Sequence, residues 1–399
     1  MLANPYHYRD SRTDGMVEKA CAILPRRQIF EQTGIQFMQI NTLYQVMAMK
    51  FAAAPALKIA RSLLLMPDLF NYLLCGRRSA EYTIASTSQM SDPRTRSWSA
   101  PLLASLGIDA SLLQRIVEPG TTLGELRGEV CEECGVEPAA VIAPGCHDTA
   151  SAVAAVPAGG DDFCYISSGT WSLMGVELAG PLINEKSLRL NYTNEGGVCG
   201  TTRFLKNIMG MWLLQECRRQ WKSEGYDHTY DELTGMAERA AAFGAMVNPA
   251  HPPFLTPGDM TGKIAEYCRQ TSQTPPTSRG EFARACLESL ALTYRLTLDG
   301  LEEVLGRPIR QIHIVGGGSR NALLNQMTAD CCGRPVVAGP VEATALGNIL
   351  VQAMAAGEVK DLPHLRRIVR ENFDVRRFEP RNPSAWDEPY RRYRRMVGD

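Results

Sequence analysis

Three consecutive glycines between a strand-like run and a helical pattern constrain the fold of this chain most strongly. Residues 312–315 form the β-prone run, and residues 316–318 are the glycines. From Asn321 onward, apolar residues such as Leu324 and Met327 recur at helical spacing. Strand, glycine turn and helix in this order are typical of an α/β domain. We therefore predict an α/β fold in which the glycine turn leads into a helix.

A second glycine turn joins two β-prone runs earlier in the chain. The runs are residues 163–166 and 171–176, and Ser168-Gly169-Thr170 lies between them. This pattern predicts a β-hairpin. A glycine in the turn lets backbone N–H groups approach an anion, and the hydroxyl of Thr170 can add a hydrogen bond to phosphate. An ordinary hairpin turn without a ligand is the alternative.

Helical patterns fill much of the remaining chain. The stretch to about residue 150 is mostly helical by pattern, and residues 42–75 are rich in Leu, Met and Ala. Residues 203–220 and 280–305 also place apolar side chains at helical spacing, with Gly300 as a candidate interruption. We expect one helix in each of these two segments.

The chain has 399 residues, which is too long for one ordinary domain and suits two or three. A small polar break at residues 157–162 changes the character of the sequence. Breaks of this kind are typical of domain boundaries. We predict a first domain over residues 1–157 and a second over residues 158–399.

Composition argues against several classes of protein. A net charge of −1 gives the whole chain no attraction for nucleic acid or for an anionic membrane. No apolar run approaches the roughly 20 residues that a membrane helix needs, and residues 1–10 lack the features of a secretory signal. Twelve cysteines in such a chain indicate reduced thiols in the cytoplasm.

Two local patterns resemble binding motifs but favour a simpler interpretation. Cys131 and Cys134 have the spacing of a zinc site, yet no second pair or histidine follows at a fitting distance. We therefore predict no metal-ligating residues. The segment from Arg366 to Arg395 combines arginines with aromatic residues, as nucleic-acid surfaces do. Interleaved acidic residues favour a solvated helical face instead.

Asp148 is the strongest single candidate for chemistry. It follows a short apolar run at residues 139–143, which predicts a buried strand, and the turn Pro144-Gly145. Ligands of open α/β sheets bind where strands end, and a carboxylate there can accept a proton from a substrate hydroxyl. The alternative is an aspartate that caps the helix predicted at residues 149–153. Local sequence leaves both interpretations open.

The glycines at residues 316–318 could hold a nucleotide close to the backbone, because they precede a helix N-terminus. They do not match the dinucleotide-binding fingerprint, whose glycine spacing differs. They do not match a phosphate-binding Walker loop either, because the lysine is absent. This motif alone is weak.

The base candidate, the hairpin turn and the late glycine turn form a recurring order. The sequence resembles the FGGY carbohydrate kinases, and among them the branch that acts on L-rhamnulose. The resemblance extends from the first residues to about residue 350. It is carried by residues 4–13, 33–44, 147–153, 167–173, 194–197, 205–210 and 315–318.

The resemblance implies two actin-like (ribonuclease-H-like) α/β domains with the site in the cleft between them. It implies transfer of the γ-phosphoryl group of ATP, with Mg²⁺, to the 1-hydroxyl of L-rhamnulose in L-rhamnose degradation. The expected partners are ATP and a small ketose, with neither nucleic acid nor membrane. A monomer is slightly favoured, and the expected location is the cytoplasm.

The same resemblance implies roles for seven residues. Asp148 is the expected catalytic base, and the sugar-binding residues are His147, Asp148, Thr149 and Asn207. The nucleotide-binding residues are Thr170, Gln215 and Gly317. If residues 203–220 form one helix, Asn207 and Gln215 lie two turns apart on one side of it, so that helix could touch both substrates.

The sequence departs from the family at its start. Each half of an actin-like kinase opens with a hairpin whose glycine turn binds phosphate, and residues 163–176 supply only the second copy. The usual first hairpin, with its Asp-Gly phosphate loop, is missing, so we expect an incomplete first domain. A misplaced start codon, a gene fragment or a genuine short form would each explain this.

These observations leave two alternatives to an active kinase for rhamnulose. The chain could phosphorylate another ketose, such as xylulose or fuculose, because the base and the glycine turns are shared among such kinases. It could also be a non-catalytic remnant that binds a sugar or a nucleotide, because one of two phosphate clamps is absent.

Overall fold

The computed structural model describes residues 1–2, 4–160 and 162–398, so Asp161 in the predicted polar break lies outside the described residues. The chain forms two compact units, each assembled from segments that are separate in sequence. Unit 1 comprises Met1–Ala155, Val176–Lys206 and Ala343–Val369, and unit 2 comprises Val156–Gly175, Asn207–Glu342 and Arg370–Asp399. The boundary at residue 157 stays a prediction.

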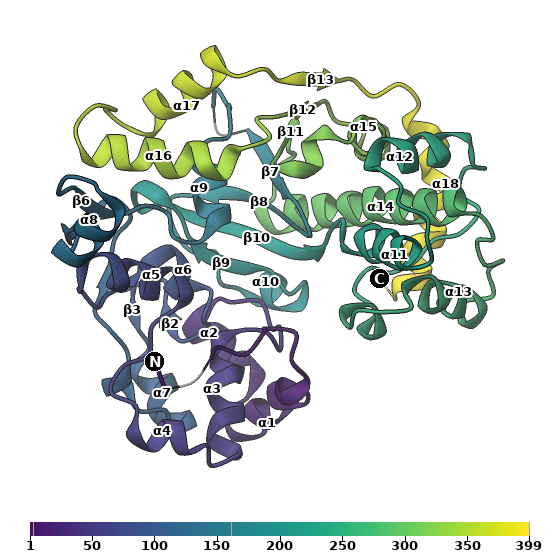
Figure 1. The fold of residues 1–399 in the computed structure, drawn as a ribbon. Helices are drawn as coiled ribbons and strands as arrows, with labels where there is room; N and C mark the ends of the chain where they lie inside the picture. Colours follow the sequence, from purple (N-terminus) through teal and green to yellow (C-terminus); the bar gives the residue numbers. More distant parts are fainter. Residues whose placement is uncertain (3, 161, 399) are drawn as a thin grey trace. The chain divides into compact units, whose positions relative to one another are not determined.

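Unit 1 begins with short helices, which confirms the mostly helical pattern of the first 150 residues (Figure 1). A buried apolar core lies among them and includes Phe30, Leu43 and Tyr44. The helices are α1 (Met16–Ile23), α2 (Arg26–Thr33), α3 (Thr42–Phe51), α4 (Pro55–Ile59), α5 (Met66–Cys75), α6 (Tyr82–Ser86), α7 (Ala100–Leu106), α8 (Gly128–Cys134) and α9 (Asp148–Ala154).

Proline and glycine set the ends of several of these helices. Pro55 and Pro67 lie in the first turns of α4 and α5, where a missing N–H costs no helical hydrogen bond. Gly76 ends α5 with a φ of 73°, a left-handed conformation that glycine adopts without strain. The prolines that interrupt the helical pattern of residues 42–75 are therefore helix starts.

Short strand pairs connect the helices of unit 1. β1 (Ala80–Glu81) pairs in parallel with β4 (Ile116–Val117). β2 (Ser91–Asp92) pairs antiparallel with β3 (Ser97–Trp98), and β5 (Thr121–Glu125) with β6 (Ala140–Ala143). β6 confirms the strand predicted before Asp148.

A later hairpin and two late helices complete unit 1. β9 (Thr193–Gly196) pairs antiparallel with the first half of β10 (Thr202–Met209), and α10 (Glu185–Arg189) precedes them. α16 (Ala343–Ala355) packs on α9, and α17 (Leu362–Asn372) follows it. The guanidinium of Arg366 on α17 donates to the carbonyl oxygen of Val153 on α9 at 3.2 Å.

Unit 2 contains a mixed sheet with the strand order β13-β12-β11-β7-β8. The strands are β7 (Phe163–Ser168), β8 (Trp171–Leu178), β11 (Gln311–Val315), β12 (Val336–Ala338) and β13 (Arg376–Phe378). β7 and β8 form the predicted antiparallel hairpin, and β11 is the predicted strand before the glycine turn. β11 runs parallel to both β7 and β12, and β13 closes the edge in the antiparallel direction.

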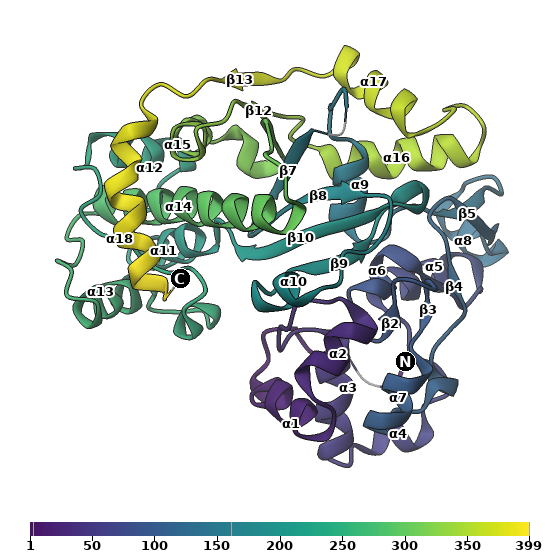
Figure 2. The ribbon, with the colours of Figure 1, turned by 180° about the vertical axis from the view of Figure 1, so that it is seen from behind.

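Four helices pack around α14 (Arg279–Leu305) in the described part of unit 2, as Figures 1 and 2 show from opposite sides. They are α11 (Trp212–Ser223), α12 (Tyr230–Arg239), α15 (Ala322–Cys332) and α18 (Asp387–Val397), and α13 (Met260–Gln270) packs on α11. α14 continues through Gly300, so the candidate interruption does not occur. The arginine-rich α18 packs on α14, where the hydroxyl of Tyr390 donates to Asp299 Oδ2 at 2.5 Å.

One predicted helix is wrong. Residues 203–220 do not form a single helix, because Thr202–Met209 is strand β10 and α11 begins at Trp212. Phe204 and Ile208 are four residues apart, a spacing that brings side chains to one face in a strand as well as in a helix. Arg203 and Phe204 point to opposite faces of the strand, and both are fully buried. Because both faces are buried, the sequence lacks the alternation of apolar and polar residues that identifies a half-exposed strand.

Two further observations concern the whole described chain. Among the described residues, no helix is long and apolar enough to cross a membrane. All twelve cysteines are free thiols.

We predict that Gly347→Ala destabilises unit 1. A Cβ atom at this position of α16 would overlap the carbonyl oxygen of Ser151 on α9 and lie 2.5 Å from its carbonyl carbon. Backbone atoms cannot yield as a side chain can, so the free energy of unfolding should fall by about 2 kcal/mol or more. Denaturant unfolding measures this change.

Gly128→Ala is the matched control for this prediction. Gly128 is the first residue of α8, and a Cβ there would meet no atom within 4 Å. Alanine is the better helix former, so this substitution should leave stability unchanged or raise it by about 0.5 kcal/mol. Equal effects of the two substitutions would contradict the close contact between α9 and α16.

Candidate active site

Asp148 is the first residue of α9, and the N-cap position of this helix is occupied by His147. Its Oδ1 atom accepts the backbone N–H of Thr149 at 2.7 Å, which satisfies one donor at the helix start. The side chain nevertheless remains 77% exposed. The known contacts of this carboxylate fall on Oδ1, so Oδ2 is available to a substrate hydroxyl.

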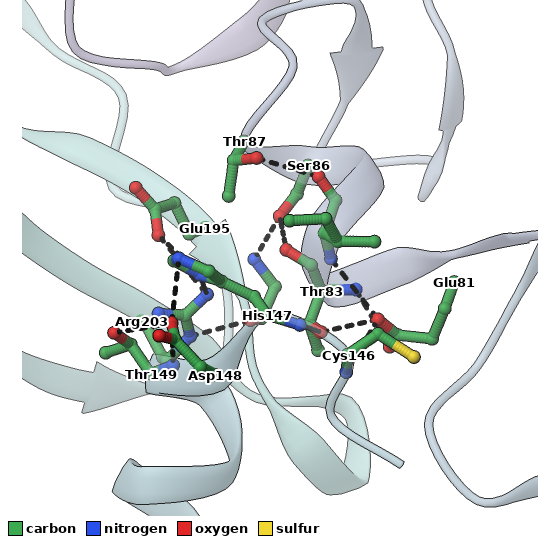
Figure 3. Close-up of polar contacts among 12 residues, drawn as sticks. Glu81, Thr83, Ser86, Thr87, Cys146, His147, Asp148, Thr149, Glu195 and Arg203 are labelled. Carbon is green, nitrogen blue, oxygen red and sulfur yellow. Dashed lines mark hydrogen bonds and ion pairs between the residues drawn. The ribbon is translucent and has the colours of Figure 1, made fainter. Parts of the chain in front are cut away.

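His147 precedes Asp148 and is itself surrounded by charged side chains (Figure 3). Its Nε2 atom lies 3.6 Å from Asp148 Oδ1. Its Nδ1 atom lies 2.9 Å from Arg203 Nη2 and 3.4 Å from Glu195 Oε2. The imidazole is therefore placed between the exposed carboxylate and a buried ion pair.

The buried ion pair comes from the β9–β10 hairpin. Glu195 and Arg203 are directly opposite each other in its antiparallel register, and Arg203 Nη2 lies 3.2 Å from Glu195 Oε2. The Nε atom of Arg203 donates to the carbonyl oxygen of Gly196 at 2.8 Å. The Arg203 side chain has no exposed surface, and that of Glu195 is 4% exposed.

A third buried group, Glu81, holds the backbone of the loop before α9. Its Oε2 atom accepts the N–H of Cys146 at 3.1 Å and the hydroxyl of Thr83 at 2.5 Å. The same hydroxyl accepts the N–H of His147 at 3.0 Å. Glu81 also caps α6 by accepting the N–H groups of Thr83 and Ile84 at 2.9 and 3.2 Å.

The α6 helix therefore supports both parts of the site in unit 1. It holds the loop through Glu81 and Thr83, and it holds the hairpin through Ser86, whose Oγ accepts the N–H of Gly196 at 2.8 Å. A Cβ atom on Gly196 would lie 2.6 Å from the ring of Tyr82, so only glycine allows this close approach.

Burial sets the protonation of two carboxyl groups behind the loop. Burial raises the pKa of Glu81 to about 7, although hydrogen bonds from Thr83, Ile84 and Cys146 act in the opposite direction. Burial also raises the pKa of Asp68 to about 7, against one hydrogen bond from the N–H of Glu81. Both groups stand behind the site rather than in it.

The three predicted nucleotide residues lie in unit 2, and two of them are in contact. The hydroxyl of Thr170, in the hairpin turn, donates to Gln215 Oε1 on α11 at 3.0 Å. The backbone brings α11 to this turn, because the N–H groups of Gly210 and Met211 donate to the carbonyl oxygens of Thr170 and Gly169 at 3.0 Å.

The glycine turn reaches the same hairpin through Ser168. Gly316 has a φ of 84°, and a Cβ atom there would lie 2.9 Å from the carbonyl oxygen of Ser168. A Cβ atom on Gly318 would lie 2.6 Å from that of Ser168. A Cβ atom on Gly317 would meet nothing within 4 Å, and this residue is exposed. The outer glycines permit packing, and Gly317 presents accessible backbone.

Asn207 lies on β10 and is half-buried, whereas Gln215 lies on α11. The prediction that one helix presents both residues is therefore wrong. In the described part of the chain, no three His, Cys, Asp or Glu side chains gather as metal ligands would.

Sequence reasoning missed Glu81, Glu195 and Arg203. Glutamate is not among the residues preferred at an N-cap, so no local signal marks Glu81 as the cap of α6. Residues 194–197 carried the family resemblance, but they suggested no role for Glu195. The helical pattern of residues 203–220 includes Arg203, so it gives no sign that this residue lies opposite Glu195 in a hairpin.

Comparison with known proteins identifies the class to which this chain belongs. Residues 1–155 match the N-terminal domain of the FGGY family of carbohydrate kinases, and residues 164–356 match its C-terminal domain. The chain belongs to the FGGY family of carbohydrate kinases. The expected two-domain α/β kinase fold is confirmed.

Individual relatives narrow the similarity to one branch of the family. The chain is 44% identical to a rhamnulokinase of Bacteroides thetaiotaomicron over 397 residues, which cover 100% of this chain and 81% of that protein. It is 43% identical to a rhamnulokinase of Enterococcus faecalis over 94% of this chain and 75% of that protein.

Solved structures share the fold at lower identity. A ligand-bound xylulose kinase from Lactobacillus acidophilus has a TM-score of 0.79 at 17% identity, covering 100% of this chain and 80% of that one. A glycerol kinase from Plasmodium falciparum with ADP has a TM-score of 0.75 at 14% identity, covering 100% and 79%.

The raised pKa of Glu81 predicts a pH dependence of stability. In the unfolded chain this group releases its proton near its usual pKa of 4.5, whereas in the folded protein it keeps the proton up to about pH 7. The folded state holds more protons in this window, so the free energy of unfolding falls as pH rises through it. The contribution of Glu81 is about 3 kcal/mol.

Urea unfolding between pH 4.5 and 7.5 measures this contribution. In Glu81→Gln the decline with pH should become shallower, and only the share of Asp68 and other groups should remain. Glu125→Gln, at an exposed position on β5, is the control and should keep the full decline. An identical decline in wild type and Glu81→Gln would show that Glu81 is ionised throughout.

Proposed function

We propose that this chain transfers the γ-phosphoryl group of ATP to the 1-hydroxyl of L-rhamnulose, giving L-rhamnulose 1-phosphate in L-rhamnose degradation. One observation carries the reaction type: the carboxylate of Asp148, exposed at the start of α9, has one oxygen held and the other available. Similarity to bacterial rhamnulokinases along nearly the whole chain supports the choice of sugar.

Asp148 is the general base in this proposal. Its Oδ2 atom accepts the proton of the 1-hydroxyl as that oxygen forms a bond to the γ-phosphorus of ATP. The bond between the γ-phosphorus and the bridging oxygen breaks at the same centre, and ADP leaves with the electron pair. Phosphoryl transfer depends mainly on alignment and charge neutralisation, so the carboxylate contributes by orienting the attacking hydroxyl as well as by accepting its proton.

The remaining predicted residues bind the two substrates. His147, Thr149 and Asn207 hydrogen-bond the hydroxyls of the sugar. Thr170, Gln215 and the exposed backbone of Gly317 bind the nucleotide, and N–H groups in such turns suit phosphate oxygens.

Mg²⁺ enters this proposal as part of the nucleotide complex. The described residues offer no cluster of metal-ligating side chains, so the ion would be held chiefly by the phosphates of ATP. When bound, it neutralises phosphate charge. No step above requires a protein ligand for it.

The proposal also covers the organisation and setting of the enzyme. Residues 1–157 would form the sugar-side domain and residues 158–399 the nucleotide-side domain. The free state of all twelve cysteines suits the reducing cytoplasm, where ATP is available. The enzyme would act there as a monomer.

Asp148→Asn should abolish most turnover. Asparagine keeps the volume and can still accept the N–H of Thr149, but it cannot take the proton. We expect kcat to fall by roughly 10²–10⁴-fold, with little change in sugar affinity. A coupled ADP-release assay measures kcat, and calorimetry measures sugar binding.

Asp109→Asn is the matched control. Asp109 also accepts a backbone N–H at a helix start, from Ser111 at 2.9 Å, and asparagine caps equally well. Its turnover should equal that of wild type. Retained turnover in Asp148→Asn would refute the base, and absence of sugar-dependent turnover in wild type would refute an active kinase.

A panel of ketoses tests the choice of sugar. L-rhamnulose should give the highest kcat/KM, and xylulose and fuculose should be at least about 10-fold poorer, because unmatched hydroxyls leave polar groups of the site unpaired. A higher kcat/KM for another ketose would replace rhamnulose as the substrate while leaving Asp148 as the base.

A further inference from the structure

The burial of the Arg203–Glu195 ion pair is not explained by a gain in the stability of the folded protein. Both side chains are buried, and removing two charges from water costs more than their mutual attraction commonly returns. Their contact with the site is through the imidazole of His147.

The contact between Arg203 and His147 determines where the imidazole proton lies. A guanidinium has only donors, so at 2.9 Å from Arg203 Nη2 the Nδ1 atom of His147 must be the acceptor. The proton of the neutral ring is then on Nε2. Glu195 Oε2, at 3.4 Å from Nδ1, would favour the opposite tautomer, but it is the more distant group and is itself paired with Arg203.

The tautomer of His147 determines whether the Nε2 edge of the ring attracts or repels the carboxylate of Asp148. With the proton on Nε2, the positive edge of the ring lies 3.6 Å from Asp148 Oδ1, beyond hydrogen-bond distance, and attracts the carboxylate electrostatically. Oδ1 also accepts the N–H of Thr149, and Oδ2 is left for the sugar hydroxyl. With the proton on Nδ1, a lone pair of Nε2 would face the carboxylate and repel it.

We propose that the buried Arg203–Glu195 pair is a positioning device that fixes the Nε2-protonated tautomer of His147 and thereby the orientation of the Asp148 carboxylate. Arg203 supplies the donor, and Glu195 together with the carbonyl oxygen of Gly196 fixes the guanidinium. Both residues act through His147 and touch no substrate. The effect on kcat rests on the proposed kinase function, whereas the tautomer does not.

The first experiment observes the tautomer in the wild-type chain. The protein is labelled with ¹⁵N-histidine, and two-dimensional NMR through the ring protons distinguishes protonated from unprotonated ring nitrogens. The spectrum of His147→Gln assigns the signals of His147. We expect a proton on Nε2 and none on Nδ1. A proton on Nδ1 would overturn the proposal, and this result requires no enzymatic activity.

The second experiment removes the pair as a unit. Glu195→Leu/Arg203→Met eliminates both charges and so leaves no buried charge unpaired. The NMR signals of His147 should change to a mixture of tautomers or to the opposite one. In the ADP-release assay kcat should fall by up to about 100-fold, the scale of a small misplacement near reacting atoms. The KM for the sugar should change much less.

A double-mutant cycle separates positioning from general support of the fold. If the pair acts through His147, its removal in a His147→Gln background should cost little further kcat. Arg284→Met/Glu288→Leu, at a buried ion pair on α14 in unit 2, is the matched control and should leave the tautomer and kcat unchanged.

Two further results would overturn the proposal. An equal loss of kcat with and without His147 would mean that the pair only supports the fold. An unchanged tautomer in the double variant would mean that Arg203 does not set it. If the double variant fails to fold, the wild-type spectrum alone decides. Absence of any turnover in wild type would refute the kinase proposal and leave the NMR test intact.

Discussion

The backbone conformation around Asp148 depends on the hydrogen bonds that the carboxylate of Glu81 accepts. It accepts three backbone N–H groups and one hydroxyl, and these donors belong to α6 and to the loop before α9. Hydrogen bonds to a charged acceptor contribute about 1.5–3 kcal/mol each, whereas burial of the charge opposes them. A pKa of about 7 reflects this near balance. The loop is thus held by a carboxyl group that is about half ionised near pH 7.

The local signals of the sequence predicted much of the fold. The hairpin around Gly169, the strand at residues 311–315 and the helix after Asn321 follow from glycine turns between runs of clear type. The segment at residues 203–220 was misassigned because a four-residue spacing of apolar side chains suits both a helix and a strand. Burial on both faces of β10 removed the polar alternation that separates the two.

The candidate site was only partly predictable for a different physical reason. Asp148 and the glycine turns are recognisable because a loop and a turn impose local sequence requirements. Glu81, Glu195 and Arg203 act on residues far away in the chain, and no local pattern encodes a hydrogen bond between Glu81 and Cys146 or between Arg203 and His147. Such groups become visible only when the fold brings the segments together.

The close packing of α9 against α16 also bears on the order in which the molecule can form. Gly347 sits against the backbone of Ser151, so the helix that carries Asp148 gains this neighbour only from a segment far along the chain. Contacts between such distant residues require a large loop to close and therefore form slowly. During synthesis from the N-terminus, α9 leaves the ribosome long before α16 exists. The packing around α9 in unit 1 must therefore be completed late, after most of unit 2 has been made.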